Sequence, residues 1–245
     1  MSCWVIVPAA GIGRRMRSEI PKQYLPLDGY TVLEHSLTRL SVMPAVREII
    51  VALAPDDPYW PKHRFERVAK PIRAVEGGKE RSDSVINALH ALTTCAKPDD
   101  WVLVHDAARP CVRISDIQKL LDECQSDPVG GLLAVPVRDT MKQAGIDGRV
   151  AHTVAREYLW HALTPQMFRF GKLVQALTQA QANKIPVTDE AMAMELAGMQ
   201  ARLVEGHADN IKITRPEDLT LAAFYLREQS EQGVPYYYDG MEDGG

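Results

Sequence analysis

The residues best able to do chemistry in this 245-residue chain form a short turn near its start. The stretch PAAGIGRR, residues 8–15, places two glycines after an apolar run and two arginines after the glycines. Gly11 and Gly13 let backbone amides approach an anion closely, and Arg15 adds a guanidinium donor beside them. The pattern predicts a phosphate-binding turn; the alternative is a glycine turn followed by two solvated arginines.

Two common nucleotide-binding motifs do not fit this turn. The dinucleotide fingerprint G-x-G-x-x-G needs glycine where the chain has Met16, and the Walker A motif needs glycine there and lysine at position 17. Nine residues after Gly13, however, Pro21 fixes the backbone directly before Lys22. Two glycines, two arginines and this lysine together describe a loop that wraps a polyphosphate.

Residues 77–85, GGKERSDSV, follow an apolar run and open a helical pattern. Gly78 lets the backbone lie close to a ligand, Ser84 supplies a hydroxyl group and Arg81 a forked donor. This segment is a second candidate ligand loop.

Two acidic residues and a lysine add to the candidate site. Residues 104–110, VHDAARP, follow another apolar run, where Asp106 can bind a ribose hydroxyl or a divalent metal and small Ala107 allows close approach. Asp209 and Lys212 precede the last predicted helix. The alternative for Asp106 is a turn cap, and for Asp209 a loop acid paired with Lys212.

Short apolar or β-branched runs with little alternation predict strands that are buried on both faces. These runs are residues 4–7, 49–54, 72–75, 101–105 and 132–135. Apolar stripes between them predict helices, as do the spacings Thr31-x-x-Glu34 and Thr214-x-x-Glu217. The alternation predicts an α/β, Rossmann-like three-layer sandwich with a mostly parallel central sheet, whose ligand loops lie at the carboxyl ends of the strands.

Residues 137–154 break this alternation with two polar-apolar segments around Asp147-Gly148, which predict a protruding β-hairpin. A surface hairpin and an exchanged dimerisation arm are equally compatible with it, since a short hairpin without a core is only marginally stable. We expect one domain over residues 1–228 and a flexible tail over residues 229–245.

Composition excludes several classes of protein. The net charge of −4 argues against a nucleic-acid binder, and no apolar run reaches the roughly 18 residues of a membrane span. The start shows no signal peptide, and the four cysteines form no C-x-x-C pair. We therefore expect no membrane or nucleic-acid partner, no structural zinc, and a cytoplasmic location.

These motifs occur together with DTMK at residues 139–142 and TPQ at residues 164–166, in order over roughly residues 4–227. In this the chain resembles the 2-C-methyl-D-erythritol 4-phosphate cytidylyltransferase family of the non-mevalonate isoprenoid pathway. The resemblance implies transfer of a cytidylyl group from CTP to the polyol phosphate, with release of pyrophosphate. It also implies a requirement for Mg²⁺ and a homodimer whose arms, residues 137–154, interlock.

The resemblance also assigns roles to residues. Arg15 and Lys22 would stabilise the transition state, while Arg156 and Lys212 would position the polyol phosphate. Further substrate contacts would come from Thr140, Thr188 and Arg109, although Arg109 equally suits a structural fork between loops. The implied nucleotide-binding residues are Pro8, Ala9, Ala10, Gly11, Gly13, Gly78, Ser84, Asp106 and Ala107. Asp106 and Asp209 are the implied metal ligands, with a contact to the ribose as the alternative for each.

Two other functions fit the same residues. A ribitol 5-phosphate cytidylyltransferase would share the nucleotide half, and a CTP-sensing module would share the glycine loop but would not need a second phosphate pocket. Lys79 departs from the family pattern, in which an acidic residue often follows the glycine pair, and this puts CTP selectivity in question if the side chain matters. From the chain length we expect no fused second enzyme.

Overall fold

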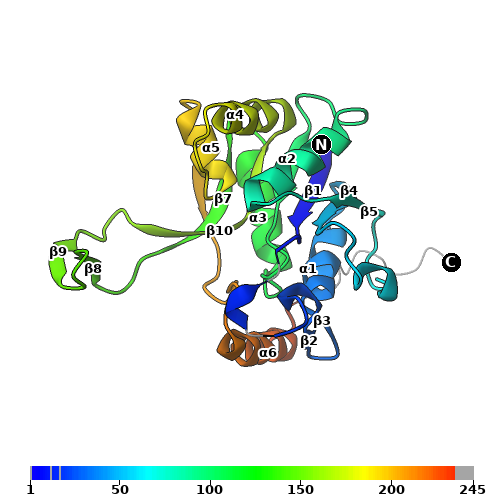
Figure 1. The fold of residues 1–245 in the computed structure, drawn as a ribbon, viewed down its shortest axis with the longest axis horizontal. Coiled ribbons are helices and arrows are strands. Elements are labelled where there is room, and N and C mark those ends of the chain that lie inside the picture. The colour runs from blue at the N-terminus through cyan, green and yellow to red at the C-terminus, as the bar shows by residue number, and fades with distance from the viewer. Residues whose placement is uncertain (1, 12, 17, 235–245) are drawn as a thin grey trace.

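The computed structural model describes residues 2–11, 13–16 and 18–234, and a seven-stranded sheet runs through the middle of the molecule (Figure 1). The strands lie in the order β11-β7-β10-β6-β1-β4-β5. Their bounds are β1 Cys3–Pro8, β4 Val46–Leu53, β5 Ile72–Glu76, β6 Trp101–Val104, β7 Gly130–Pro136, β10 Trp160–Arg169 and β11 Arg202–Glu205. Only β10 runs antiparallel to its neighbours, so the sheet is mostly parallel, as predicted.

Helices cover both faces of this sheet, which confirms the three-layer architecture (Figure 1). Alternate side chains of β1 show the division: Val5 and Val7 belong to one buried cluster, Trp4 and Ile6 to the other. The first cluster contains the apolar faces of α1 and α3, and the second those of α2, α4 and α5. The helix bounds are α1 Val32–Ser41, α2 Arg81–Leu92, α3 Ile114–Cys124, α4 Phe170–Ala182 and α5 Glu190–Leu196.

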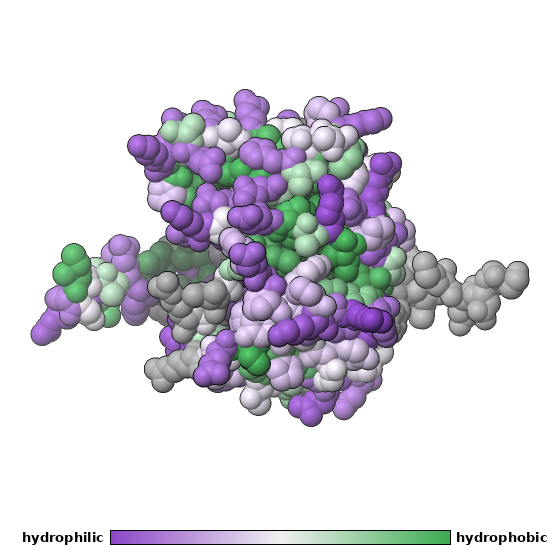
Figure 2. Space-filling model, turned by 45° about the vertical axis from the view of Figure 1, so that its right-hand side comes forward, coloured by the Kyte–Doolittle hydropathy of each residue, from purple (hydrophilic) through white to green (hydrophobic). Residues whose placement is uncertain are grey.

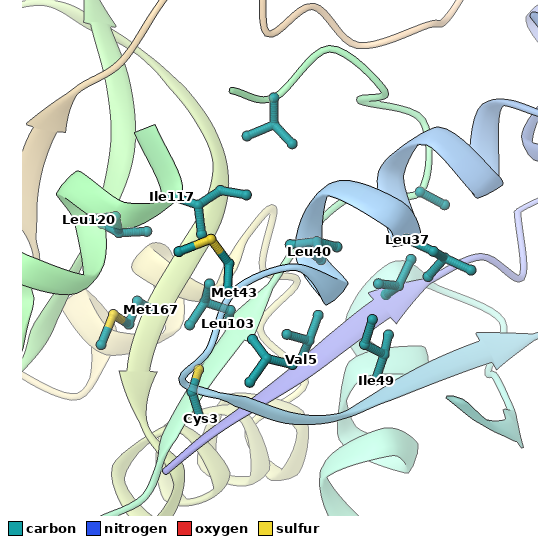
Figure 3. Packing of buried hydrophobic residues seen from close by; sticks show 14 of the residues in the cluster. Cys3, Val5, Leu37, Leu40, Met43, Ile49, Leu103, Ile117, Leu120 and Met167 are labelled. Atoms are coloured by element: carbon teal, nitrogen blue, oxygen red, sulfur yellow. The ribbon is translucent and has the colours of Figure 1, made fainter. Parts of the chain in front are cut away.

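The first cluster is shown from close by in Figure 3. Leu37 and Leu40 of α1 and Ile117 of α3 meet Val5 and Leu103 of the central strands, and all five are fully buried. This packing holds β1 and β6 side by side in the centre of the sheet.

A third apolar cluster lies below the sheet in the view of Figure 1, between α6 (Pro216–Glu231) and the small hairpin of β2 (Pro26–Leu27) and β3 (Tyr30–Thr31). Leu25 and Leu27 pack there with Ala222 and Leu226 of α6. The cluster therefore fastens the segment that follows Lys22 to the C-terminal helix.

The starts of two helices test the predicted caps. Thr31 caps α1, where its hydroxyl oxygen accepts from the Glu34 amide at 3.2 Å. At α6 the capping group is Asp218 rather than Thr214 or Glu217: its carboxylate accepts from the backbone amides of Thr214 and Arg215 at 2.8 and 2.9 Å. The prediction of the helix was right, and that of its cap was wrong by one residue.

The predicted hairpin is present, with β8 (Met141–Ala144) and β9 (Val150–Val154) forming a sheet of their own. It projects well away from the body of the molecule (Figure 1), and residues 138–153 are all exposed. Gly148, with a φ of +76°, lies in the turn.

The C-terminal boundary differs from the prediction. Helix α6 continues to Glu231, and Gln229 is buried, where its side-chain amide donates to the Cys111 carbonyl at 3.0 Å. The domain therefore extends beyond residue 228, and residues 235–245 of the expected tail lie outside the described residues. None of the helices in the described part of the chain combines the length and hydropathy that a bilayer span needs.

Candidate active site

The loops that follow β1, β5 and β6 meet in a cleft at the carboxyl edge of the sheet. From β1 the chain continues to β4 and β5 on one side, and β6 lies on the other side, so the cleft is at the point where the strand order reverses. Such switch points are where open α/β sheets bind ligands. Ten predicted site residues line the cleft: Pro8, Ala9, Ala10, Gly11, Lys22, Gly78, Ser84, Asp106, Ala107 and Lys212.

A second cavity opens beside the first. Arg81, Asp106 and Lys212 line both cavities, and the second extends to the predicted substrate residues Arg109 and Thr188. The sequence-predicted nucleotide residues and part of the predicted polyol-phosphate residues therefore lie on two sides of one group of charges.

Glycine is required in the loop that opens α2. A Cβ atom on Gly78 would lie 2.2 Å from the Cβ of Asp83, which leaves no room for a side chain. The Ser84 hydroxyl accepts from the Gly78 amide at 3.0 Å and donates to the Glu80 carbonyl at 3.2 Å. Ser84 therefore shapes the loop that lines the cleft.

Asp106 lies at the centre of the charged group and is 6% exposed. Its carboxylate contacts Arg81 Nε at 2.9 Å and Lys212 Nζ at 2.8 Å, with Arg109 Nε at 3.6 Å. Burial alone would raise the pKa of this carboxyl, but the three cations hold the pKa well below its usual value. Asp106 is therefore a fixed anion that gathers cations around it, and the prediction that it caps a turn does not describe its side chain.

The orientation of Arg81 comes from a residue that the sequence did not single out. Glu190, fully buried at the start of α5, accepts from Arg81 NH1 and NH2 at 2.6 and 2.9 Å. Burial opposes the charge on Arg81, while Glu190 and Asp106 raise its pKa. The pair spans 109 positions of sequence, so no local pattern could reveal it.

Lys22 reaches the cleft from a one-turn 3-10 helix, Lys22–Tyr24, and its Nζ donates to the Ile213 carbonyl at 2.9 Å. Burial, followed by the neighbouring Lys212, lowers the pKa of Lys22 to about 8. Asp106 acts in the opposite direction, and Arg15 adds to the lowering. A cation that its surroundings disfavour is well placed to bind an incoming anion.

Arg109 both lines the second cavity and joins two loops. Its NH1 donates to the Asn210 carbonyl at 2.7 Å, so Arg109 does join two loops, while its place in the cavity leaves the substrate contact as a prediction. The neighbouring His105 is fully buried, with its two ring nitrogens at 3.1 Å from the Arg109 carbonyl and 3.0 Å from the Thr164 hydroxyl. Burial lowers the pKa of His105 to about 4, which suits a neutral packing residue.

The structure corrects the assignment of Asp209. Its carboxylate accepts from Arg113 NH2 at 2.6 Å and from the Gln229 amide at 2.8 Å, and Asp209 lines neither cavity. It therefore anchors α6 and the preceding loop rather than facing a metal, and its cationic partner is Arg113, not Lys212. Within the described residues, no group of three or more His, Cys, Asp or Glu side chains is arranged to hold a metal ion.

Besides Asp209, four predicted residues lie outside both cavities. Gly13, with a φ of +62°, packs against Lys22, because a Cβ atom there would be 3.2 Å from the lysine Cγ. Arg15 is exposed beside this turn. Thr140 is exposed in the arm, and Arg156 at its base donates to the Arg138 carbonyl. This chain alone thus brings neither Thr140 nor Arg156 to the cleft.

The chain has close relatives of known name. Residues 3–228 match a family model described as 2-C-methyl-D-erythritol 4-phosphate cytidylyltransferase. A protein of that name from Pseudomonas entomophila (strain L48) is 56% identical over 217 residues, which are 88% of this chain and 92% of the relative. Another from Vibrio atlanticus (strain LGP32) is 51% identical over 226 residues, 92% and 96% of the two chains. The crystal structure of the Francisella tularensis protein of that name superimposes with a TM-score of 0.79 at 39% identity, covering 92% of this chain and 100% of that chain.

Proposed function

The chain belongs to the 2-C-methyl-D-erythritol 4-phosphate cytidylyltransferase family, and we propose that the cleft described above is where it catalyses this family's reaction. The enzyme transfers the cytidylyl group of CTP to 2-C-methyl-D-erythritol 4-phosphate, giving 4-diphosphocytidyl-2-C-methyl-D-erythritol and pyrophosphate in isoprenoid precursor biosynthesis. The observation that supports this location is the group of Lys22, Arg81 and Lys212 beside the glycine loops at the switch point of the sheet.

The attacking group needs no general base. A phosphate monoester has a second pKa of about 6, so it is largely a dianion at neutral pH. One of its oxygens attacks the α-phosphorus of CTP; a new P–O bond forms, the bond from that phosphorus to the bridging oxygen breaks, and its electron pair leaves on pyrophosphate. In agreement, no histidine is among the described residues that line the cleft.

What the protein must supply is positive charge. Two anionic substrates repel each other, and further negative charge develops on the oxygens around the α-phosphorus in the transition state. We assign Lys22 and Arg15 to the triphosphate and Lys212 to the polyol phosphate, with Thr188 and Arg109 beside it. The cytosine and ribose lie against the backbone of residues 8–11, Gly78 and Ala107 in this proposal.

Asp106 is the residue that we assign to Mg²⁺. Mg²⁺ in nucleotide sites is commonly bound by one or two carboxylates together with substrate phosphates. Asp106 is a buried carboxylate that lines both cavities next to the proposed triphosphate site, so it would hold the ion together with phosphate oxygens and share its charge with Arg81 and Lys212. When bound, the ion neutralises charge on the phosphate oxygens. The chain's own residues hold Asp106 ionised and fix its orientation through Arg81.

The arm is the part of the proposal that needs a second copy of the chain. Thr140 and Arg156 carry the substrate roles implied by the family, but in this chain they are exposed and line neither cavity. We propose a homodimer in which each arm brings these two residues to the cleft of its partner. A cytoplasmic location, which the scattered cysteines favour, stays a prediction.

One assay tests the proposed function. The purified protein is incubated with CTP, Mg²⁺ and either 2-C-methyl-D-erythritol 4-phosphate or ribitol 5-phosphate, and pyrophosphate release is measured. We expect turnover with the first alcohol and little with the second. Turnover with ribitol 5-phosphate alone would overturn the substrate assignment, and binding of CTP without pyrophosphate release would favour a sensor.

A further inference from the structure

The one-turn helix that carries Lys22 is attached to the rest of the protein at three places. Lys22 Nζ donates to the carbonyl of Ile213, and the side-chain amide of buried Gln23 donates to the Ala9 carbonyl at 2.6 Å. The third residue, Tyr24, points to a different part of the chain, the segment of residues 57–63 that follows β4. No local sequence pattern connects that segment with the site.

Tyr24 is held there by its hydroxyl group and by its ring. The residue is 4% exposed, and its hydroxyl donates to Asp57 Oδ2 at 3.0 Å. Its ring stacks with Tyr59 and with His63, at centroid distances of 5.3 and 5.2 Å and interplanar angles of 25° and 8°. Burial, together with the hydrogen bond to Asp57, raises the pKa of Tyr24, so the phenol stays protonated and donates.

Asp57 in turn organises the segment that receives Tyr24. Its other carboxylate oxygen, Oδ1, accepts from the backbone amides of Tyr59 and Trp60 at 2.9 and 3.1 Å. One carboxylate thus fixes both the start of the one-turn helix Trp60–Lys62 and the position of the Tyr24 hydroxyl. The Tyr24 hydroxyl and the Asp57 carboxylate are therefore both held in defined positions.

Lys22 has little freedom of its own to compensate if this anchor moves. The position that a Cβ atom on Gly13 would occupy lies 3.2–3.3 Å from the Cβ, Cγ and Cδ atoms of Lys22, so the aliphatic stem is packed against the phosphate-binding turn. A shift of the one-turn helix therefore displaces the ammonium group. Displacing a catalytic group by about 1 Å can cost on the order of 10²-fold in rate.

We propose that Tyr24, fixed by Asp57, is a positioning residue that sets the place of the Lys22 ammonium group in the cleft. Asp57 thereby acts on the cleft through Tyr24, although it lines neither of the two cavities. This inference rests on the proposed role of Lys22 at the triphosphate.

The test removes the phenol oxygen of Tyr24 while keeping its ring. We expect Tyr24→Phe to lower kcat about tenfold and to change the KM for CTP less than about twofold, because Lys22 acts mainly in the transition state. Tyr59→Phe is the matched control: its hydroxyl makes only a 3.4 Å contact to the Glu19 carbonyl, and its ring keeps the stack with Tyr24. We expect wild-type kcat for that variant. Equal kcat for Tyr24→Phe and wild type would overturn the proposal.

A double-mutant cycle separates this proposal from the role of Lys22 itself. In a Lys22→Ala background, Tyr24→Phe has nothing left to position, so we expect no further loss of kcat. A further loss of the full tenfold would overturn the proposal, since Tyr24 would then act independently of Lys22. If Lys22→Ala alone keeps near-normal kcat, the proposed role of Lys22 fails and so does the proposal that depends on it.

Asp57→Ala removes the same hydrogen bond from the other side, because Asp57 is the acceptor of the Tyr24 hydroxyl. We expect its loss of kcat not to add to that of Tyr24→Phe in the combined variant. Full additivity of the two losses would contradict a shared action. The thermal unfolding temperature of each variant is measured as well, so that kcat values are compared only between variants that are folded at the assay temperature.

Discussion

Asp106 in the cleft and Ile146 at the tip of the arm have opposite surroundings. Asp106 is 6% exposed and contacts three cationic side chains of its own chain, whereas Ile146 is fully exposed. Figure 2 shows apolar and hydrophilic residues side by side on the arm, away from the body of the molecule. In the cleft, the chain holds its own charged side chains in place by contacts within itself. The arm presents side chains that its own chain does not cover.

This difference separates two kinds of site residue. Lys22, Arg81 and Lys212 have their positions fixed by partners in the same chain, so substitutions there act on one site directly. Thr140 and Arg156 have no such framework around the cleft in this chain. Four experiments challenge or refine this contrast, beginning with the largest expected effect.

The first concerns Lys22, whose ammonium group donates to the Ile213 carbonyl in the cleft. We expect Lys22→Ala to lower kcat by about 10²- to 10³-fold, the scale of removing one transition-state donor, with a smaller effect on CTP binding. Steady-state kinetics with varied CTP measures both. A variant with near-normal kcat would show that the Lys22 charge does not stabilise the transition state.

The second asks which chain the arm serves. Lys22→Ala and Arg156→Ala chains are each expected to be nearly inactive, and are refolded together. If Arg156 acts in the partner's cleft, each mixed dimer has one complete site and one that lacks both residues. With random pairing about half of the dimers are mixed, so about a quarter of wild-type activity returns.

Each variant refolded alone is the control for that experiment. If Arg156 acts within its own chain, every site in the mixture lacks one residue and no activity returns. The arm would then be an ordinary surface hairpin, and the contrast between the two regions would disappear.

The sequence predicts the features that depend on residues close together in the chain. It does not predict contacts between residues that lie far apart in the sequence. The buried strands of residues 4–7 and 49–54 are predicted because runs of apolar residues are a local signal; the first lies within β1, and the second overlaps β4 over residues 49–53 but misses its first three residues. Strand β10 was missed. Pro165 lies inside it, which argues against a strand, and the structure accommodates the proline where the register with β7 is interrupted between Ala162 and Gln166.

In the candidate site, too, local patterns were predictive and contacts between distant residues were not. Motif spacing placed Lys22, Gly78, Asp106 and Lys212 together, because each follows a strand or a loop whose end is recognisable. The partner of Arg81 was not predictable, since Glu190 comes from a helix far along the sequence. Asp209 was misassigned for the related reason that its true partners, Arg113 and Gln229, are brought to it only by the fold.

The third experiment uses the pH dependence of kcat/KM for CTP. Lys22 is proposed to act as a cation, and burial followed by Lys212 lowers its pKa to about 8, with Arg15 and Arg109 adding to this and Asp106 opposing it. The charged form is therefore present below pH 8 and lost above it. We expect kcat/KM to fall about tenfold per pH unit above that value.

Lys22→Arg is the control for the pH profile. An arginine stays charged over the accessible pH range, so this variant, although slower, is expected to give a flat profile between pH 8 and pH 10. The same decline in Lys22→Arg would assign the titration to another group. A flat wild-type profile would mean that the free cleft does not disfavour the lysine charge.

The smallest effect is expected at the tip of the arm, where Ile146→Ser is compared with Leu103→Ala in the fully buried core. Leu103→Ala should lower the free energy of unfolding by about 2–5 kcal/mol. Ile146→Ser should change it by less than about 0.5 kcal/mol when urea unfolding is measured at protein concentrations that favour the monomer, because its side chain contacts little within its own chain.

If the arm docks on a second copy, however, we expect Ile146 to be buried in the contact between the two chains. Losing that burial, about 1.5 kcal/mol or more, corresponds to at least roughly a tenfold rise in the dissociation constant of the dimer in sedimentation measurements. An unchanged dissociation constant would place Ile146 outside the interface and leave the arm's contribution to residues nearer its base, Thr140 and Arg156.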